Sequence, residues 1–290
     1  MAPEKVAEKP QEKDSNKRMK ILCLHGFRTS GAFLKKQISK WDPSIFADFD
    51  LDFPDGAYPA GGKSDIETIF PPPYFEWFQF EKDFTVYFNL EECISRLCDY
   101  ITTNGPFHGL LGFSQGTSLA GLLLGYQAQG KVLKDHPPFK FFVAVSGSKF
   151  RAPSIRDVAY KDPISVKSVH FIGEKDWLKL PSEDLASAFV NPLIIRHPQG
   201  HTVPRLDEAA VEKMRAWTAG IVAEGEKVGA AESCPDQKVS APAALEEAEK
   251  EEEGAEVEAA AQSGGCNAPG GAAWKAESVN KMETEAVEAT

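Results

Sequence analysis

The most informative segment of the sequence is Phe107-His108-Gly109-Leu110-Leu111-Gly112-Phe113-Ser114-Gln115-Gly116-Thr117-Ser118-Leu119-Ala120. A short apolar run leads into Gly-Phe-Ser-Gln-Gly, and an apolar segment rich in Ala and Leu follows. This pattern is typical of a nucleophile elbow, in which a strand turns so sharply into a helix that the central serine takes a strained conformation. Glycines at 112 and 116 fit such a turn because side chains there would clash with the neighbouring strand and helix.

The elbow predicts secondary structure on both of its sides. A buried strand is expected at 110–111 and a helix over 115–129. The helix is expected to pack on the sheet through Leu119, Leu122, Leu123 and Tyr126. The turn between the two elements lifts the Ser114 hydroxyl clear of the sheet, at a helix N-terminus that favours negative charge.

Apolar segments that alternate with helical patterns surround the elbow. Strands are expected over 19–24, 49–53, 140–146, 166–172 and 193–196, and helices over 30–41, 90–104, 181–189 and 203–224. Strands that are apolar throughout and alternate with helices favour a parallel sheet covered on both faces. The sequence therefore predicts an α/β fold with a mostly parallel central sheet, whose ligands bind at the carboxyl ends of the strands.

The negative charge of the chain is concentrated in its C-terminal part. The formal net charge is −11, and residues 221–290 carry 16 acidic and 5 basic residues against 27 of each elsewhere. A neutral body has no basic excess for binding nucleic acid. We predict a folded domain over residues 19–224, a disordered N-terminal segment over 1–18, and an acidic, disordered tail over 225–290. The tail has a single aromatic residue, Trp274, and too little apolar surface for a core.

The cysteines and the apolar runs bear on the cellular compartment. Cys23, Cys93, Cys98, Cys234 and Cys266 contain no C-x-x-C pair and no even framework. They indicate reduced thiols in a cytoplasmic protein, with the nucleus as the alternative compartment. The charged N-terminus lacks the apolar segment of a secretory signal. The longest aliphatic run, at 119–124, is far shorter than the ~20 residues of a membrane span.

A serine hydroxyl becomes a good nucleophile when a neighbouring base accepts its proton and an acid orients that base. Asp176 follows a buried strand and is favoured as the acid over Glu174, which we expect to be a solvated loop charge. His201 is favoured as the base because Gly200 gives it loop freedom beyond the last strand. His197 remains the alternative base, at the end of that strand.

His25 follows the first strand, and we expect it to hold the loop there rather than to relay protons. The order of the three favoured residues along the chain is Ser, Asp, His, which is the order of α/β-hydrolases.

Five blocks of the sequence resemble a known family. They are Leu24-His25-Gly26-Phe27-Arg28, Gly112-Phe113-Ser114-Gln115-Gly116, Val145-Ser146-Gly147, Gly173-Glu174-Lys175-Asp176 and Gly200-His201-Thr202-Val203-Pro204. Together they are similar to the FSH family of serine hydrolases, also called the ovarian-cancer-gene-2-protein-like esterases, over about residues 19–220.

The resemblance implies an α/β-hydrolase fold without a separate large cap domain, acting on acyl esters without a metal or organic cofactor. It implies a catalytic triad of Ser114, Asp176 and His201, and an oxyanion hole made by the backbone N–H groups of Phe27 and Gln115. Some fungal dihydrofolate reductases carry a similar domain. In this chain no G-x-G-x-x-G follows a strand, so we do not expect a reductase.

The predicted function is that of a serine carboxylesterase that hydrolyses a small-molecule acyl ester through an acyl-enzyme on Ser114. An acyl thioesterase is the alternative within enzymes, because both reactions pass through the same acyl-enzyme. A hydrolase-fold ligand receptor is the alternative from a different class. A weaker possibility is an interaction protein that acts through its acidic tail. The sequence names no protein partner.

An aromatic cluster bears on the substrate. Nine of the thirty aromatic residues fall within nineteen positions: Phe70, Tyr74, Phe75, Trp77, Phe78, Phe80, Phe84, Tyr87 and Phe88. Long loops over a site tend to be functional, and residues 56–88 are too long for a plain connection. We expect some of these rings to line an apolar trough for a medium- or long-chain acyl group, with Trp77 and Phe78 as the candidate contacts.

Overall fold

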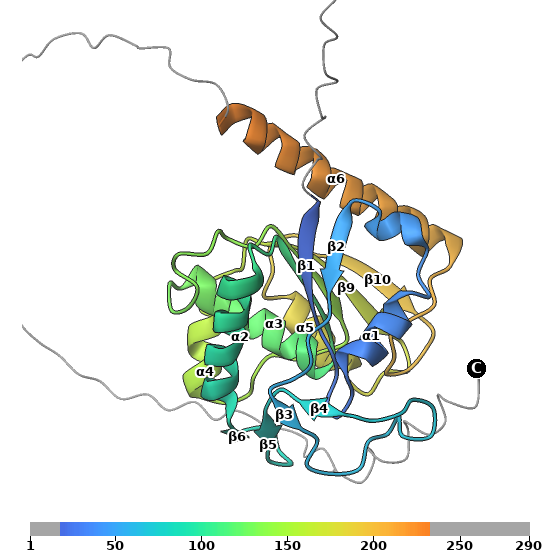
Figure 1. The fold of residues 1–290 in the computed structure, drawn as a ribbon, viewed down its shortest axis with the longest axis vertical. Coiled ribbons are helices and arrows are strands. Elements are labelled where there is room, and N and C mark those ends of the chain that lie inside the picture. Colours follow the sequence, from blue (N-terminus) through green and yellow to red (C-terminus); the bar gives the residue numbers. More distant parts are fainter. Residues whose placement is uncertain (1–17, 233–290) are drawn as a thin grey trace, which may run out of the picture.

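A single six-stranded sheet forms the centre of the protein (Figure 1). The computed structural model describes residues 18–232, and residues 1–17 and 233–290 lie outside this part. The strand order is β10-β9-β8-β7-β1-β2, and every neighbouring pair is parallel. The strands are β1 (Met19–Leu24), β2 (Phe49–Asp52), β7 (Gly109–Phe113), β8 (Phe141–Val145), β9 (Lys167–Gly173) and β10 (Leu193–His197). The predicted α/β class and parallel sheet are confirmed.

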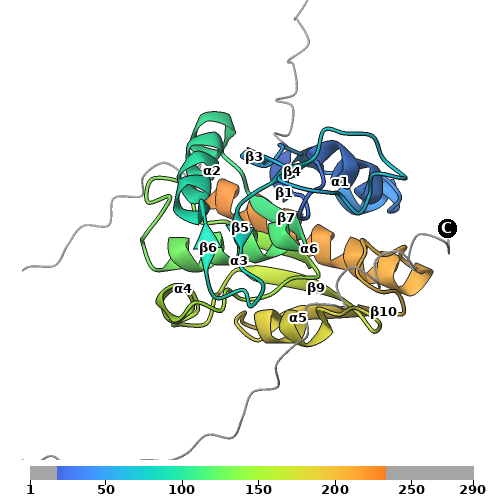
Figure 2. The same cartoon turned by 90° about the horizontal axis from the view of Figure 1, so that it is seen from below.

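Helices cover both faces of this sheet, as Figures 1 and 2 show. Side chains alternate along a strand, so Ile21 and Cys23 of β1 belong to one core while Leu22 and Leu24 belong to the other. The first core is closed by α1 (Gly31–Ile38), the 3₁₀ helix η1 (Pro43–Phe46) and α6 (Glu208–Glu232). The second is closed by α2 (Leu90–Asn104), α3 (Gln115–Ala128) and α5 (Lys179–Ala186), with α4 (Pro153–Ala159) packed on α3.

Helix α3 is apolar on nearly all sides because it lies against the sheet and is covered in turn by α4. Leu119, Leu122 and Leu123 have no exposed surface, and Tyr126 packs partly buried on the same core. The four packing positions predicted from the sequence are therefore confirmed. A helix that is hydrophobic all round belongs in an interior, and this interior places the elbow at the centre of the domain.

The helix ends were predicted less well than the strands. Ser30 caps α1 as expected, accepting from the Phe33 N–H at 3.2 Å, but the helix ends at Ile38 rather than residue 41. The last helix was expected from residue 203 and begins at Glu208, because Pro204 lies in a loop whose carbonyl accepts a hydrogen bond from Trp41 Nε1. It continues to Glu232, past the expected end at 224. Helix α4 and the 3₁₀ helix were not predicted.

Residues 56–88 form a strap between β2 and α2. Two short antiparallel pairs stiffen the strap: β3 (Tyr58–Pro59) with β4 (Phe75–Glu76), and β5 (Gln79–Phe80) with β6 (Tyr87–Phe88). Figure 1 shows these four short strands below the central sheet, at the end toward which β1 and β2 point. The Phe75 N–H donates to the Thr29 carbonyl at 2.7 Å. This hydrogen bond attaches the strap to the loop after β1. Within residues 18–232 no separate large cap domain is present.

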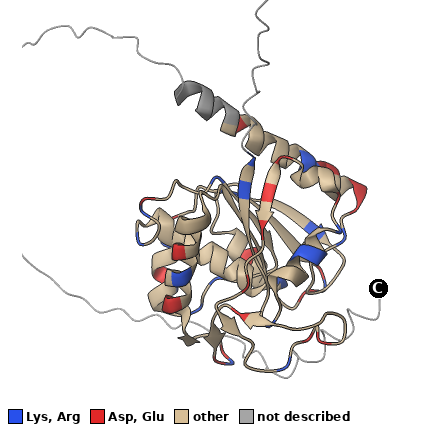
Figure 3. Cartoon of the chain, viewed as in Figure 1, with Lys and Arg blue, Asp and Glu red and all other residues tan. Residues whose placement is uncertain are grey.

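Charged residues of both signs are interspersed on the described elements, for example along α2 (Figure 3). Helix α2 places Glu92 and Arg96 one turn apart, with a 2.6 Å ion pair between them. In residues 18–232, none of the helices has both the length and the apolar character needed to cross a bilayer. That nucleic acid is not a partner stays a prediction.

Candidate active site

The candidate site lies where the strand order reverses. The chain proceeds from β1 outward to β2, then returns to place β7 on the other side of β1. Loops that follow two such strands face a common crevice. A Cβ atom built on Gly26 would lie 3.0 Å from the Phe113 ring and 3.6 Å from the Ser114 Cβ. The loop after β1 therefore packs directly on the residue that follows β7.

The turn at Ser114 has the strained geometry of a nucleophile elbow. Ser114 has φ 53° and ψ −114°, a conformation that non-glycine residues rarely adopt. A Cβ on Gly112 would lie 2.5 Å from Thr117 Cα, and a Cβ on Gly116 would lie 2.0 Å from the Leu24 carbonyl oxygen. Both contacts are with backbone, so neither position has room for a side chain. The Ser114 N–H is held by the carbonyls of Val145 and Ser146, at 3.0 and 3.1 Å.

Three side chains predicted to act together do lie together. Ser114 Oγ is 2.9 Å from His201 Nε2. His201 Nδ1 is 3.0 Å from Asp176 Oδ1 and 3.2 Å from Oδ2. The His201 side chain is 7% exposed and the Asp176 side chain 1%, so water competes little for these contacts. A histidine bonded in this way has Nδ1–H donating to the carboxylate and Nε2 free to accept the serine proton.

The surroundings of Asp176 keep its carboxyl group ionised. Burial alone would raise the pKa of Asp176, but hydrogen bonds and charge attraction from His201, together with donors from Ser146 and Leu178, lower it below its usual value. The Leu178 N–H donates to Oδ1 at 2.8 Å, and the Ser146 hydroxyl donates to Oδ2. Ser146 lies in one of the five family-like blocks of the sequence, but no role was predicted for it. Its position directly after β8, beside the strand that leads to Asp176, was the available signal.

The two rival histidines have other surroundings. His197 closes β10 with both ring nitrogens buried, and neither forms a hydrogen bond to Ser114 or Asp176. Burial lowers the pKa of His197 and so favours its neutral form. His25 is fully buried, and burial lowers its pKa to about 4. Its Nε2 accepts from the Gly56 N–H at 2.8 Å, which assigns the proton to Nδ1, 2.7 Å from the Gly26 carbonyl. His25 therefore holds the loop after β1 against the strap.

Two backbone N–H groups adjoin the serine. Phe27 lies in the loop that packs on the elbow, and Gln115 is the first residue of α3. Within residues 18–232, neither the Phe27 N–H nor the Gln115 N–H donates a hydrogen bond to another atom of the chain. Free N–H groups at a helix N-terminus and on a neighbouring loop are the donors that a developing oxyanion needs.

A cavity of about 930 Å³ opens at Ser114 and His201. Its volume is at the upper end of what small-molecule sites have. Its aromatic lining includes four of the nine rings of the sequence cluster, Phe78, Phe80, Phe84 and Tyr87, joined by Phe27 and Phe150. The rings contact one another: Phe80 lies 4.9 Å from Phe27 and 4.7 Å from Phe84, between ring centroids.

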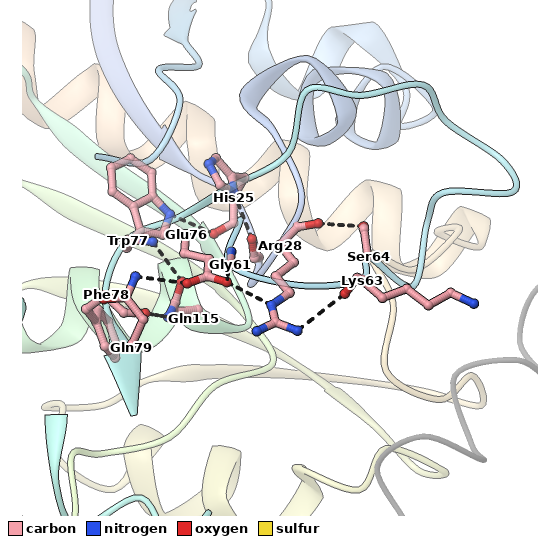
Figure 4. Close-up of polar contacts among 11 residues, drawn as sticks. His25, Arg28, Gly61, Lys63, Ser64, Glu76, Trp77, Phe78, Gln79 and Gln115 are labelled. Atoms are coloured by element: carbon pink, nitrogen blue, oxygen red, sulfur yellow. Dashed lines mark hydrogen bonds and ion pairs between the residues drawn. The ribbon is translucent and has the colours of Figure 1, made fainter. Parts of the chain in front are cut away.

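Trp77 does not line this cavity, which corrects the expectation that it contacts substrate. Its side chain is turned into the protein, with the residue 3% exposed and Nε1 donating to the His25 carbonyl at 2.9 Å (Figure 4). Phe78 lines the cavity, whereas Trp77 supports its wall from within the protein. The candidate contact at Phe78 remains a prediction.

In the part of the chain that the structure describes, no three His, Cys, Asp or Glu side chains are arranged to hold a metal ion. The thiols of Cys93 and Cys98 have pKa values raised by burial, to about 12 and about 11, so they stay protonated. Cys23 is fully buried.

The sheet, the strained serine turn and the Ser–His–Asp arrangement define the protein as an α/β-hydrolase. A family model described as Serine hydrolase (FSH1) matches residues 15–213, which is more than half of the chain. The chain belongs to this family, so the predicted family and the predicted class, a serine hydrolase of the carboxylic ester hydrolases, are confirmed.

Of three related proteins, two are named as hydrolases and one as a reductase. The Family of serine hydrolases 2 protein of Saccharomyces cerevisiae is 33% identical over 215 residues, covering 68% of this chain and 96% of that protein. Esterase OVCA2 of Xenopus tropicalis is 30% identical over 203 residues, covering 64% and 86%. A dihydrofolate reductase of Schizosaccharomyces pombe is 29% identical over 208 residues, but the match covers 66% of this chain and only 45% of that protein.

Solved structures agree on the fold. Zea mays acyl-protein thioesterase 2 superposes with a TM-score of 0.51 at 16% identity, covering 72% of this chain and 96% of that one. At this identity the likeness concerns the fold alone. The predicted α/β-hydrolase fold is confirmed.

Proposed function

We propose that this chain is a carboxylesterase that cleaves acyl esters through an acyl-enzyme on Ser114, with a preference for medium or long acyl chains. The observation that carries the proposal is the 2.9 Å contact between Ser114 Oγ and His201 Nε2, at a strained elbow that opens on an aromatic cavity. The Asp176 carboxylate on the far side of the imidazole supplies the third member.

The first half of the reaction forms the acyl-enzyme. Ser114 Oγ attacks the ester carbonyl carbon while His201 Nε2 takes the hydroxyl proton. The carbonyl oxygen becomes an oxyanion, which the N–H groups of Phe27 and Gln115 stabilise. The imidazolium is stabilised by Asp176, whose lowered pKa keeps it a carboxylate. When the tetrahedral intermediate collapses, His201 passes its proton to the leaving alcohol.

The second half regenerates the serine. Water takes the place of the departed alcohol, gives its proton to His201 and attacks the acyl carbonyl carbon. The same two N–H groups stabilise the second oxyanion. Collapse releases the carboxylic acid and returns the proton to Ser114. A thioester would pass through the same acyl-enzyme and differ only in its leaving group.

The acyl chain is proposed to lie along the aromatic side of the cavity, beside Phe78, Phe80 and Phe84. Each methylene transferred from water to such a surface contributes about 0.8 kcal/mol. With straight-chain p-nitrophenyl esters from two to sixteen carbons, kcat/KM is therefore expected to rise roughly fourfold per carbon until the cavity is full. The Phe80→Ala variant should flatten this rise because it removes a ring from the wall.

Phe88→Ala is the matched control. Phe88 belongs to the same aromatic cluster, but it is 49% exposed and does not line the cavity, so the rise should persist. Highest activity on the acetyl ester, without gain on lengthening, would contradict the proposed acyl site. Matched thioesters in the same series decide between esterase and thioesterase. A single turnover followed by tight retention of the ligand would favour the receptor alternative.

A further inference from the structure

Glu76 is a carboxylate buried in the strap, away from the reacting groups. Its side chain is 1% exposed, and it does not line the cavity. Burying a charge is unfavourable unless the charge is paired and hydrogen-bonded, so the contacts of this residue need an explanation. Oε1 accepts from Arg28 Nε at 2.8 Å and from the Gly61 N–H at 3.0 Å, and Oε2 accepts from Gln79 Nε2 at 2.9 Å (Figure 4).

Arg28 is the residue directly after Phe27, and its backbone is strained. Its φ is 53°, in the left-handed region that an arginine rarely occupies. The surroundings must hold such a conformation in place. Two strap residues do so: Ser64 Oγ donates to the Arg28 carbonyl at 2.6 Å, and Glu76 fixes the guanidinium. The guanidinium also lies over the Phe27 ring, 4.7 Å from its centroid.

The next two strap residues, Trp77 and Phe78, form hydrogen bonds with the Gln115 side chain. The Trp77 N–H donates to Gln115 Oε1 at 3.1 Å, and Gln115 Nε2 donates to the Phe78 carbonyl at 2.8 Å. Residues 76–78 thus contact both Arg28 and Gln115. Figure 4 shows these side-chain contacts of Arg28 and Gln115. Arg28 directly follows Phe27, and Gln115 itself carries the second N–H group assigned to the oxyanion.

We infer that Glu76 is a positioning residue for the oxyanion site, acting through Arg28 to fix the Phe27 N–H beside Ser114. The inference rests on the proposed function. A preorganised donor acts on the charge that develops in the transition state, so its displacement lowers kcat more than it weakens substrate binding. Glu76 touches neither the serine nor the cavity, so it acts on the site through another residue, and its ion pair with Arg28 is the side-chain contact that adjoins Phe27.

Glu76→Gln keeps the shape of the side chain but removes the charge that holds Arg28. Loss of a whole oxyanion donor costs about 10²- to 10³-fold in kcat, so a displaced donor is expected to cost about 10- to 100-fold. KM should stay within about threefold. An alkyl trifluoromethyl ketone, which forms a tetrahedral oxyanion on the serine, should bind more weakly by the same factor as kcat. The fatty acid product should inhibit as it inhibits the wild type.

Glu67→Gln is the matched control, since Glu67 is a strap carboxylate paired at 3.1 Å with Lys63 but 41% exposed. It should behave as the wild type. All rates are expressed per active site, counted by fluorophosphonate titration, so that a smaller folded fraction does not imitate a lower kcat. Arg28→Lys keeps a positive charge but cannot reproduce the Nε contact, and it should show the same kcat-selective loss. The double variant should lose little more than the larger single loss.

The outcomes of these experiments distinguish a failure of the Glu76 inference from a failure of the proposed esterase function. Equal kcat for Glu76→Gln and the wild type, a loss confined to KM, or additive losses in the double variant would overturn the positioning role. If Glu76→Gln does not fold, the same readouts on Arg28→Lys decide the matter. A wild-type chain whose turnover does not depend on Ser114 would instead overturn the proposed function itself.

Discussion

Replacing His201 by alanine is expected to lower kcat/KM by at least about 10³-fold. His201 Nε2 is the only base within hydrogen-bond reach of Ser114 Oγ among the residues that the structure describes, at 2.9 Å. Without it the serine proton has no acceptor, and members of such a triad act as a unit. The loss is measured with the best ester of the chain-length series. The variant should also lose thermal stability, because the Asp176 carboxylate, whose side chain is 1% exposed, loses its partner.

His197→Ala is the control for this experiment because it removes the rival histidine from the same segment. His197 is buried without a hydrogen bond to Ser114 or Asp176, so the variant should lose some stability and keep kcat/KM per active site within about tenfold. The opposite pattern, with activity lost in His197→Ala and kept in His201→Ala, would show that the base was assigned wrongly.

Gly116→Ala is expected to prevent normal folding of the domain. The added methyl group would lie 2.0 Å from the Leu24 carbonyl oxygen and 2.7 Å from that of His25. Both are backbone atoms at the end of β1, a strand paired on both of its sides, so neither can move away cheaply. Overpacking of this kind should cost at least about 3 kcal/mol of unfolding free energy, a large part of a domain's total. Chemical denaturation of the purified chain measures it.

Gly220→Ala is the matched control, because it makes the same change inside another helix. A Cβ at Gly220 of α6 meets no atom within 4 Å. Alanine there should raise the unfolding free energy by about 0.5–1 kcal/mol through its better helix propensity. Equal effects at the two positions would contradict the close approach of α3 to β1.

The sheet could be predicted because short runs of apolar residues are enough to identify its strands. Buried parallel strands are apolar throughout, and β1 was predicted with both of its ends. The helix α2 was equally clear, because Asn104-Gly105-Pro106 ends it. The start of α6 was missed because the apolar residues of 203–207 pack in the same core without being helical.

The close approach of the three candidate side chains could also be predicted, but the contacts that support them could not. Ser114, Asp176 and His201 each follow a strand or its loop, and a parallel sheet brings such ends together. Ser146 and Glu76 form contacts between segments distant in sequence, which no local pattern records. The side to which Trp77 points depends on the pairing of two-residue strands, and single-sequence periodicity does not resolve these.

The most direct test of the central assignment is the site of covalent modification by an alkyl fluorophosphonate, mapped by mass spectrometry of the digested chain. The reagent should modify Ser114, approach one adduct per chain and abolish hydrolysis in proportion. Ser118→Ala, one helical turn further along α3, should be modified as the wild type is, and Ser114→Ala should be neither modified nor active. An adduct on a different residue, or undiminished modification of Ser114→Ala, would contradict Ser114 as the nucleophile.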